Sequence, residues 1–478
     1  MSSPVEAAIR GVVTKGLLHV ANFNRAHRKA KAPNPFLTGV HTPLEAEQTF
    51  TDLRVTGTIP PSLNGLYLRN GPNPFTPPNP ATHHWFAGDG MLHGVRLEGG
   101  KALWYRNRWV RSNAISQALG EAPVPGPASR FESPNTNVVA MAGKIWALVE
   151  AGGLPMEVSD TLESRTRSDF GGLLALGYTA HPHLDPVTGE THAICYNAME
   201  PTVIWHTVLD TDGTVRRHEP VAVQDGPSIH DCMITQNYVI VMDLPVTFSM
   251  PALISGENFP YRWNPKHPAR IGLLPRTGKG SEIIWCEIEP CYIFHPANAY
   301  ETEDGTVIMD ACVHSTVFAD GQMGPNAPVT TFESLEIDPA ARKVTRTVID
   351  AAPQEFPRPD ERLIGQPYRF AYTVALPPAG VAEWMGASCL YKHDLGTKTR
   401  QVRDFGAGKL PGEFVFVPAH AGAAEDEGWL IGYVIDTGAG TTDLVILDAQ
   451  DFTGPAAAAI TIPHRIPPGF HGNWVALP

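Results

Sequence analysis

The sequence predicts an all-β protein and, among all-β folds, a β-propeller. With 478 residues and 43% hydrophobic composition the chain can bury a large core, while 44 Gly and 45 Pro indicate many tight turns rather than long helices. From about residue 50 to the end, short segments rich in β-branched and aromatic residues alternate with turn residues. A propeller accommodates many short antiparallel strands without long exposed edges, although a pair of sandwiches or a large barrel also fits this pattern.

A helix is expected at the N-terminus, before the strands begin. Apolar residues recur there at helical spacing, and basic residues lie beside and after them: Val5, Ile9, Val12, Val13, Leu17 and Val20, with Arg10, Lys15, Arg25, Arg28, Lys29 and Lys31. Two interpretations stay open. The helix rests on a membrane surface, or it docks on the protein or frays.

The strands expected after this helix have clear ends. In chain order they are residues 144–150, 202–209, 238–242, 282–288, 306–309, 430–435 and 444–447. Asp212-Gly213 and Asp304-Gly305 each lie between two such segments, and Asp-Gly is among the strongest short-range hairpin signals. We therefore expect antiparallel hairpins at both dipeptides.

Charge and cysteine usage restrict the partners and the compartment. The formal net charge of −13, without a dense basic block outside the N-terminus, argues against a nucleic-acid partner. The six cysteines form no CxxC pair and no cleavable signal peptide precedes them, so the simplest expectation is a cytoplasmic protein. No segment has the roughly 18 uninterrupted apolar residues of a membrane span. Membrane contact, if present, is then peripheral.

Four of the 19 histidines lie where apolar segments meet turns: His181, His230, His295 and His471. Neutral imidazole is a good ligand for iron, zinc or copper. For any one of these residues, however, a buried imidazole satisfied by the backbone is the commoner explanation. Their wide spacing resembles no local metal motif such as HExxH, so the residues alone leave four-histidine coordination as a guess.

Longer motifs decide between these interpretations. Several stretches, in this order, closely resemble the signatures of the carotenoid cleavage oxygenase family over about residues 45–478: Asn64-Gly-Leu-Tyr-Leu-Arg-Asn-Gly-Pro-Asn-Pro74, His84-Trp-Phe-Ala-Gly-Asp-Gly-Met-Leu-His93, Ala180-His-Pro-His-Leu-Asp185, Ile229-His-Asp-Cys-Met-Ile-Thr235, Phe294-His-Pro-Ala-Asn-Ala299 and Phe470-His-Gly-Asn-Trp-Val475. Several motifs in one order are far more specific than any single pattern. Ala87, before Gly-Asp-Gly, and Pro296, after the third histidine, depart from the family pattern without removing a ligand.

The resemblance implies a seven-bladed β-propeller with a helical and loop cap. Residues 1–44 would be the N-terminal helix and its lead-in, and residues 45–478 the catalytic domain. His181, His230, His295 and His471 would bind one iron(II) ion, Fe2+, on the propeller axis and serve as the catalytic centre. Glu150, Glu355 and Glu413 correspond to the glutamates that orient three of the ligands in this family, because a carboxylate that accepts the other ring N–H fixes the tautomer.

The implied activity is that of a dioxygenase. Dioxygen and an apolar polyene, a carotenoid or apocarotenoid, would be the substrates, and scission of one C=C bond would give two aldehydes. The polyene would enter through a tunnel, for which the stretch 246–274 offers Phe248, Phe259 and Trp263 and the third ligand motif offers Phe294. Ordinary packing under a long loop explains these aromatic residues equally well.

Three other functions stay open. A stilbene- or phenylpropene-cleaving oxygenase of the same family is one, although its lignostilbene branch carries a Lys before the first orienting Glu, where this chain has Val149. A propeller hydrolase or lactonase is another, but it would hold calcium through carboxylate or amide oxygens. A catalytically silent binding propeller is the third, and the complete set of four histidines and three glutamates argues against it.

Overall fold

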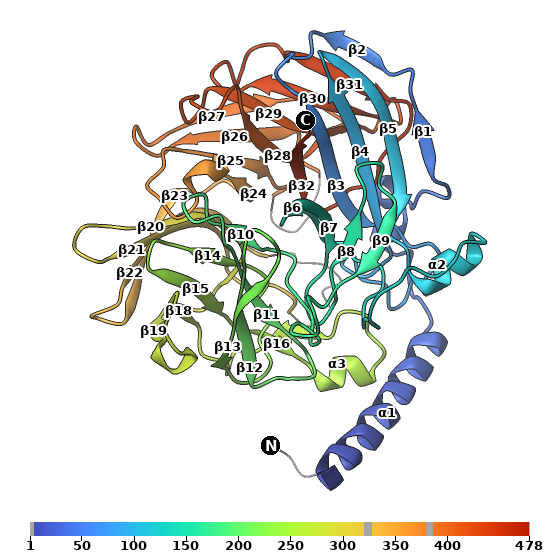
Figure 1. Cartoon of the computed structure of the whole chain (residues 1–478), viewed down its shortest axis with the longest axis vertical. Coiled ribbons are helices and arrows are strands. Elements are labelled where there is room, and N and C mark those ends of the chain that lie inside the picture. The colour runs from blue at the N-terminus through green and yellow to red at the C-terminus, as the bar shows by residue number, and fades with distance from the viewer. Residues whose placement is uncertain (1–3, 320–326, 379–385, 478) are drawn as a thin grey trace.

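Strands account for most of the regular structure. The computed structural model describes residues 4–319, 327–378 and 386–477. Within these residues the helices are short or peripheral: α1 (Pro4–His27), α2 (Asn113–Ala118) and α3 (Met250–Ile254), with the 3-10 helices η1 (Pro35–Leu37), η2 (Gly39–His41), η3 (Gly280–Glu282) and η4 (Glu361–Leu363). The expected all-β class is confirmed, and the sheets surround a central axis as in a propeller (Figure 1).

Most sheets are up-and-down meanders of consecutive strands. One has the order β6-β7-β8-β9 (Asn137–Met141, Lys144–Leu148, Met156–Val158, Ser164–Arg167). The next is β10-β11-β12-β13 (His183–Leu184, Thr191–Tyr196, Val203–Leu209, Val215–Ala222). A third is β24-β25-β26-β27 (Gln354–Arg358, Phe370–Ala375, Cys389–Asp394, Thr399–Asp404). A small hairpin pairs β16 with β17 (Val246–Phe248, Tyr261–Trp263).

Two five-stranded sheets combine strands from both ends of the chain. One has the order β1-β5-β4-β3-β32 (Gln48–Phe50, Lys101–Trp109, Gly90–Glu98, Gly65–Pro72, Gly472–Ala476). The other has the order β2-β31-β30-β29-β28 (Arg54–Gly57, Ala458–Ile462, Thr441–Asp448, Gly428–Asp436, Lys409–Pro418). Pairing of β3 with β32 and of β2 with β31 joins the two ends of the chain and so closes the ring.

The largest sheet corrects the expected number of blades. Its order is β14-β15-β18-β19-β23-β22-β21-β20 (Cys232–Ile234, Tyr238–Asp243, Arg270–Pro275, Ile284–Glu287, Lys343–Asp350, Thr330–Asp338, Val307–His314, Tyr292–Glu301). The described residues thus form five separate blade-sized sheets of four or five strands and one of eight, not seven separate blades. Two sets of four strands merge because β19 and β23 meet in a parallel bridge between Glu287 and Lys343.

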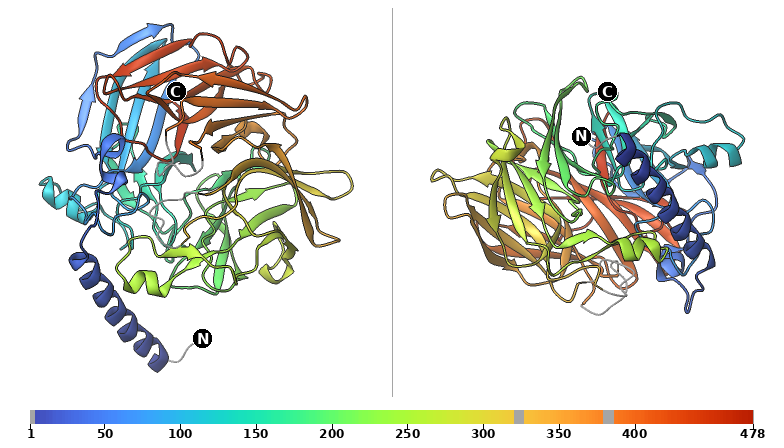
Figure 2. Two further views of the ribbon diagram at one scale, coloured as in Figure 1. Left: turned by 180° about the vertical axis from the view of Figure 1, so that it is seen from behind. Right: turned by 90° about the horizontal axis from the view of Figure 1, so that it is seen from below.

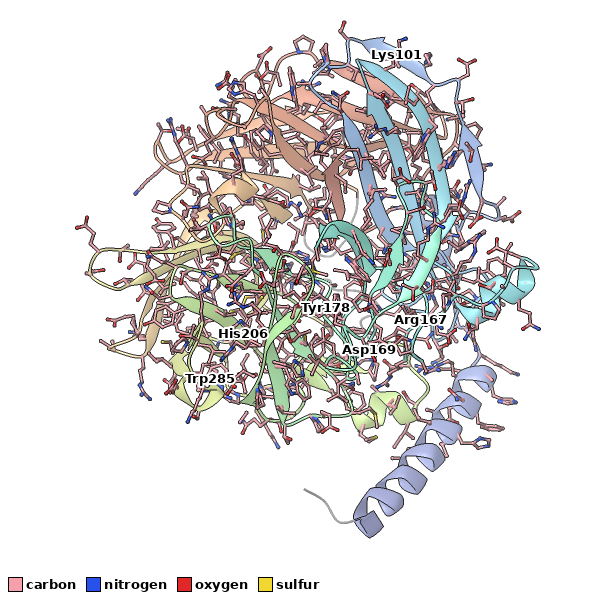
Figure 3. The ribbon with its side chains drawn as sticks, in the orientation of Figure 1. Lys101, Arg167, Asp169, Tyr178, His206 and Trp285 are labelled. Carbon is pink, nitrogen blue, oxygen red and sulfur yellow. The ribbon has the colours of Figure 1, made fainter. Side chains whose placement is uncertain are left out.

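One edge strand of each four- or five-stranded sheet, and both end strands of the eight-stranded sheet, lie next to the axis. Contacts run from β10 to β14 and then in turn to β20, β24, β28, β32 and β6. Each is an edge strand of its meander or, for β14 and β20, an end of the eight-stranded sheet. Side chains such as Tyr178 and His206, both fully buried, fill the space between sheets (Figure 3). Residues far apart in sequence therefore meet at the centre when they lie on these inner strands.

The predicted strands correspond to β7, β12, β15, β19, β21, β29 and β30. Their ends differ by a few residues: Glu282 belongs to η3, and β21 continues past Met309 to His314. Both hairpins are confirmed, since β12 pairs antiparallel with β13 and β20 with β21. Gly213 and Gly305 each have a φ of 85°, a conformation that favours glycine in such turns.

The N-terminal helix is present as α1, and the side chains of its first residues lie outside the described part. It projects from one side of the ring next to α3 (Figure 2). Asn24 Nδ2 donates to Ile254 O at 2.7 Å, and Arg25 Nε donates to Gly256 O at 3.2 Å, so the end of α1 is tied to the end of α3. Among the described residues, no helix is long and apolar enough to cross a membrane.

Candidate metal centre

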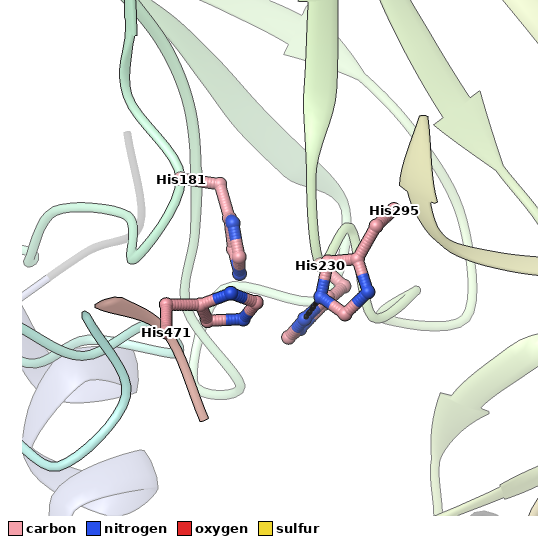
Figure 4. Close-up of side chains that lie close together, drawn as sticks. All are labelled: His181, His230, His295 and His471. Atoms are coloured by element: carbon pink, nitrogen blue, oxygen red, sulfur yellow. Dashed lines mark hydrogen bonds between the residues drawn. The ribbon is translucent and has the colours of Figure 1, made fainter. Parts of the chain in front are cut away.

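Four buried imidazoles converge on the axis (Figure 4). His181 and His230 lie just before β10 and β14, His295 lies in β20, and His471 immediately precedes β32. One ring nitrogen from each lies within 4.8 Å of those of the other three. The four ligands expected from sequence are thus brought together because each lies at or beside an inner strand.

Irregularities in the inner strands orient one imidazole and two glutamates of this site. The register of β20 shifts on both sides of Pro296, directly after His295, and that of β24 shifts after Glu355, where Phe356 has a φ of 53°. In β28 the register shifts around Glu413. A bulge adds an unpaired residue and redirects a side chain, so these local breaks turn one imidazole and two carboxylates inward.

The three expected glutamates lie behind three of the imidazoles. His295 Nδ1 is 2.6 Å from Glu355 Oε2, and His471 Nδ1 is 3.1 Å from Glu413 Oε1. His230 Nδ1 is 2.9 Å from Glu150 Oε2, an ion-pair contact. An ionised carboxylate only accepts hydrogen bonds, so Nδ1 carries the proton in His295 and His471. In the neutral imidazoles Nε2 then has a free lone pair.

These lone pairs make the site fit a metal ion. His230 Nε2 and His295 Nε2 face each other at 3.1 Å, and two lone pairs at this distance repel unless a proton or a metal cation lies between them. His181 Nε2 is buried without a hydrogen-bond partner. Metal–imidazole bonds of about 2.1 Å would separate two adjacent ligand nitrogens by about 3.0 Å, close to the observed spacing.

The electrostatics of the site keep Glu355 and Glu413 ionised. Burial would raise the pKa of Glu355, but contacts with His295 and His314 hold it well below the usual range for Glu. Burial, followed by the three neighbouring imidazoles, holds the pKa of His181 well below its usual value. Burial also lowers the pKa of His471, and Glu413 opposes that shift only in part. Neutral imidazoles backed by anions are the form that binds metal.

His181 is held differently from the other three imidazoles. Its Nδ1 lies 3.7 Å from Asp231 Oδ2, too far for a direct hydrogen bond. Asp231 Oδ1 in turn lies 2.8 Å from His183 Nε2. This contact gives His183 a structural role, and Asp231 is not among the site residues expected from sequence. The only sequence signal for Asp231 is its position directly after His230.

An apolar cavity of about 560 Å³ opens onto the centre. His230, His295 and His471 line it, whereas His181 does not and so lies on the far side of the centre. Eight aromatic residues form much of its wall: Phe86, Phe131, Tyr196, Phe259, Tyr261, Phe294, Phe356 and Phe470. Sequence reasoning named two of them. Phe86 and Phe470 lie within family motifs, and Phe356 directly follows Glu355, so the sequence held a signal for all three.

Two aromatic residues expected in the tunnel lie outside the cavity wall. Phe248 and Trp263 belong to the β16–β17 hairpin, and neither lines the cavity. Phe248 packs edge-on against Tyr261, with ring centroids 5.9 Å apart, and it is Tyr261 that reaches the cavity. Helix α1 contributes to the wall instead, through Leu18, Asn22 and Arg25.

Comparison with known proteins identifies the family to which this chain belongs. The family model described as retinal pigment epithelial membrane protein (RPE65) matches residues 41–476. A protein of Mycobacterium tuberculosis called carotenoid cleavage oxygenase is 41% identical, over 93% of this chain and 98% of that protein. The chain belongs to the RPE65/carotenoid cleavage oxygenase family. The expected membership of this oxygenase family is confirmed.

Two solved structures of related oxygenases have the same fold as this chain. The lignostilbene dioxygenase of Pseudomonas brassicacearum superposes with a TM-score of 0.84 at 25% identity, over 94% of this chain and 99% of that chain. The cobalt-substituted apocarotenoid oxygenase (ACO) of Synechocystis superposes with a TM-score of 0.78 at 28% identity, over 91% and 97%. The second structure is, by its description, a metalloprotein.

Proposed function

We propose that this chain is an iron(II)-dependent dioxygenase that cleaves one C=C bond of a carotenoid or apocarotenoid to give two aldehydes. One observation carries the proposal. Four buried imidazoles, three with Nδ1 held by carboxylates, converge beside an aromatic cavity. We further propose His181, His230, His295 and His471 as the ligands and Glu150, Glu355 and Glu413 as the groups that orient three of them.

Family membership and the four imidazole donors together support iron as the bound metal. Imidazole nitrogen suits iron, zinc, copper and nickel, so the ligands alone do not choose among them. Iron(II) with open coordination positions supplies the activation of dioxygen. The chain's own residues hold the four nitrogens in place, bind the Nδ1 side of His295 and His471 through carboxylates so that Nε2 faces the centre, and exclude bulk water. None of these residues needs to act as a general acid or base.

The cavity supports an apolar polyene as the substrate. Its aromatic wall can bury hydrocarbon, which contributes about 25 cal/mol for each Å² removed from water. Val149 lines the cavity directly before Glu150 and offers no hydrogen bond. A phenol hydroxyl left there without a partner would cost on the order of 1–3 kcal/mol. A hydrocarbon carries no such cost.

Cleavage of a hydroxystilbene is the second candidate, and the TM-score of 0.84 to a lignostilbene dioxygenase favours it. Val149 argues against it, for the reason given above. The hydrolase alternative is weaker, because the carboxylates of this site face Nδ1, behind the imidazoles, rather than the centre where a calcium ion would need oxygen ligands.

Peripheral membrane contact is a further part of the proposal. Exposed apolar side chains lie in the cavity wall and on the two neighbouring helices: Leu18 and Phe131 line the cavity, Phe23 lies on α1, and Met250 lies on the adjoining α3. The exposed basic residues Arg28, Lys29 and Lys31 follow α1 directly. An apolar patch with flanking positive charge favours an anionic lipid surface. From there a polyene could enter without crossing water.

One architectural proposal accompanies this function. The family match from 41 to 476 supports residues 45–478 as one catalytic domain.

Product analysis tests the substrate proposal. The iron-loaded protein should convert at least one carotenoid or apocarotenal in detergent micelles to two aldehydes identified by mass spectrometry. Hydroxystilbenes should turn over at least ten times more slowly. Efficient stilbene cleavage with no polyene cleavage would reverse the choice of substrate and leave the metal site standing.

A further inference from the structure

A fifth histidine stands behind the metal centre on the same carboxylate as His295. His314 ends β21 and is fully buried. Its Nε2 lies 2.7 Å from Glu355 Oε1, while Glu355 Oε2 lies 2.6 Å from His295 Nδ1 and accepts a hydrogen bond from the backbone N–H of Phe356. One carboxylate is therefore shared between two imidazoles, one at the centre and one behind it.

The strand next to β21 fixes the tautomer of His314. Thr330 is directly opposite His314 in the β21–β22 register, and its Oγ1 lies 3.0 Å from His314 Nδ1. Because the ionised carboxylate can only accept, His314 must donate through Nε2. Its Nδ1 then accepts from the Thr330 hydroxyl. The hydrogen-bond directions run without conflict from Thr330 through His314 and Glu355 to His295.

We propose that His314 is a positioning residue for the metal centre: it holds the Glu355 carboxylate in the plane that keeps His295 protonated at Nδ1 and its Nε2 lone pair aimed at the metal. This inference rests on the metal site of the proposed function. Outer hydrogen-bond partners of a ligand commonly set metal affinity in this way. His314 does not line the cavity and makes no direct contact with the substrate space.

The other two orienting glutamates are supported differently, which sets His295 apart. Glu413 accepts a hydrogen bond from the Gly472 N–H at 2.8 Å. The Arg358 guanidinium lies 3.5 Å from the same carboxylate and partly neutralises its charge. Glu150 lines the cavity and its side chain is 12% exposed. Glu355 is fully buried, and its second partner is the His314 imidazole rather than a guanidinium or the cavity. His295 should therefore be the most rigidly oriented ligand.

Two substitutions separate this role from packing. His314→Phe keeps a ring against Phe294, 5.2 Å away, but removes the donor to Glu355. His314→Gln keeps an N–H donor near the Nε2 position and loses the ring. The matched control is His393→Phe. His393 is also buried and its Nε2 lies 2.7 Å from Gln354, the residue before Glu355 in β24, but it has no contact with the centre.

The measurements are iron(II) and cobalt(II) affinity by chelator competition, the visible spectrum of the cobalt-loaded protein, and thermal unfolding of the metal-free protein. His314→Phe should weaken metal binding by up to about tenfold, since it acts only through Glu355, and change the cobalt spectrum. His314→Gln should recover much of the affinity. His393→Phe should lower the unfolding temperature but bind metal within about twofold of wild type. Thr330→Val, which leaves both imidazoles in place, should cause a smaller loss in the same direction.

The outcomes distinguish this inference from the proposed function. A wild-type protein that binds no metal would overturn the metal site itself. If the wild type binds metal and both His314→Phe and Thr330→Val match its affinity and cobalt spectrum, the positioning role is wrong. Equal losses of metal affinity in His314→Phe and His393→Phe would show that His314 contributes only to packing. If His314→Phe does not fold, His314→Gln and Thr330→Val decide by the same criteria.

Discussion

Replacing Glu355 by Gln should weaken metal binding by about tenfold while leaving the fold intact. The carboxylate accepts three hydrogen bonds, two at Oε2 and one at Oε1. The amide oxygen of Gln should take the Oε2 position, where two donors meet. Its NH2 group then faces His314 Nε2, and His314 can shift its proton to Nδ1 and donate to Thr330. His295 would keep its Nδ1 proton but lose a charged acceptor.

The size of the effect follows from that one change. Hydrogen bonds to charged groups contribute about 1.5–3 kcal/mol and neutral ones about 0.5–1.5 kcal/mol, so the His295 contact loses about 1.4 kcal/mol, or tenfold in affinity. Chelator competition measures the loss. Glu333→Gln is the control, because Glu333 is equally buried but pairs with Arg346 and Thr331. Wild-type affinity in Glu355→Gln, or an equal loss in Glu333→Gln, would refute the reasoning.

Three further predictions concern the cavity, helix α1 and pH. Val149→Lys, which places a cation in the cavity wall, should lower polyene turnover and raise hydroxystilbene turnover by at least about tenfold each, measured as steady-state kcat/KM. Deleting residues 1–27 removes part of the cavity wall, so it should raise KM for a polyene and lower liposome co-sedimentation, and unchanged values for both would contradict the assigned role. Burial lowers the pKa of His267, but Asp243 and Asp225 outweigh it and raise that pKa. The stabilisation is therefore complete below the unfolded-state pKa of about 6.5 and lost as pH rises through the folded-state value, so His267→Asn should cost more stability in urea unfolding at pH 5.5 than at pH 9.

The strand pattern could be predicted from sequence, but the joining of sheets could not. Turn chemistry at Asp212-Gly213 and Asp304-Gly305 is local, and both hairpins form as expected. The merger of two meanders depends on one bridge between Glu287 and Lys343, residues with no local signal that they are partners. A count of blades from sequence therefore does not give the count of sheets.

The candidate ligands could be named only with the help of family motifs. Spacing alone left His181 and His471 as ordinary buried histidines, because the inner strands that bring them together are separated by most of the chain. The cavity wall was harder to predict. Tyr261 rather than Phe248 reaches the cavity, and the orientation of a short hairpin that decides this is a tertiary property. His314 and Asp231 carry no motif signal for the roles that their contacts indicate.

Metal content of single histidine variants tests the central claim most directly. We expect the wild type to bind about one iron per chain and each of the four variants His181→Ala, His230→Ala, His295→Ala and His471→Ala to lose most of that iron together with turnover. His206→Ala, which removes a fully buried imidazole away from the centre, should retain it. Wild-type iron content and turnover in two or more of the four variants would contradict a four-histidine metal centre.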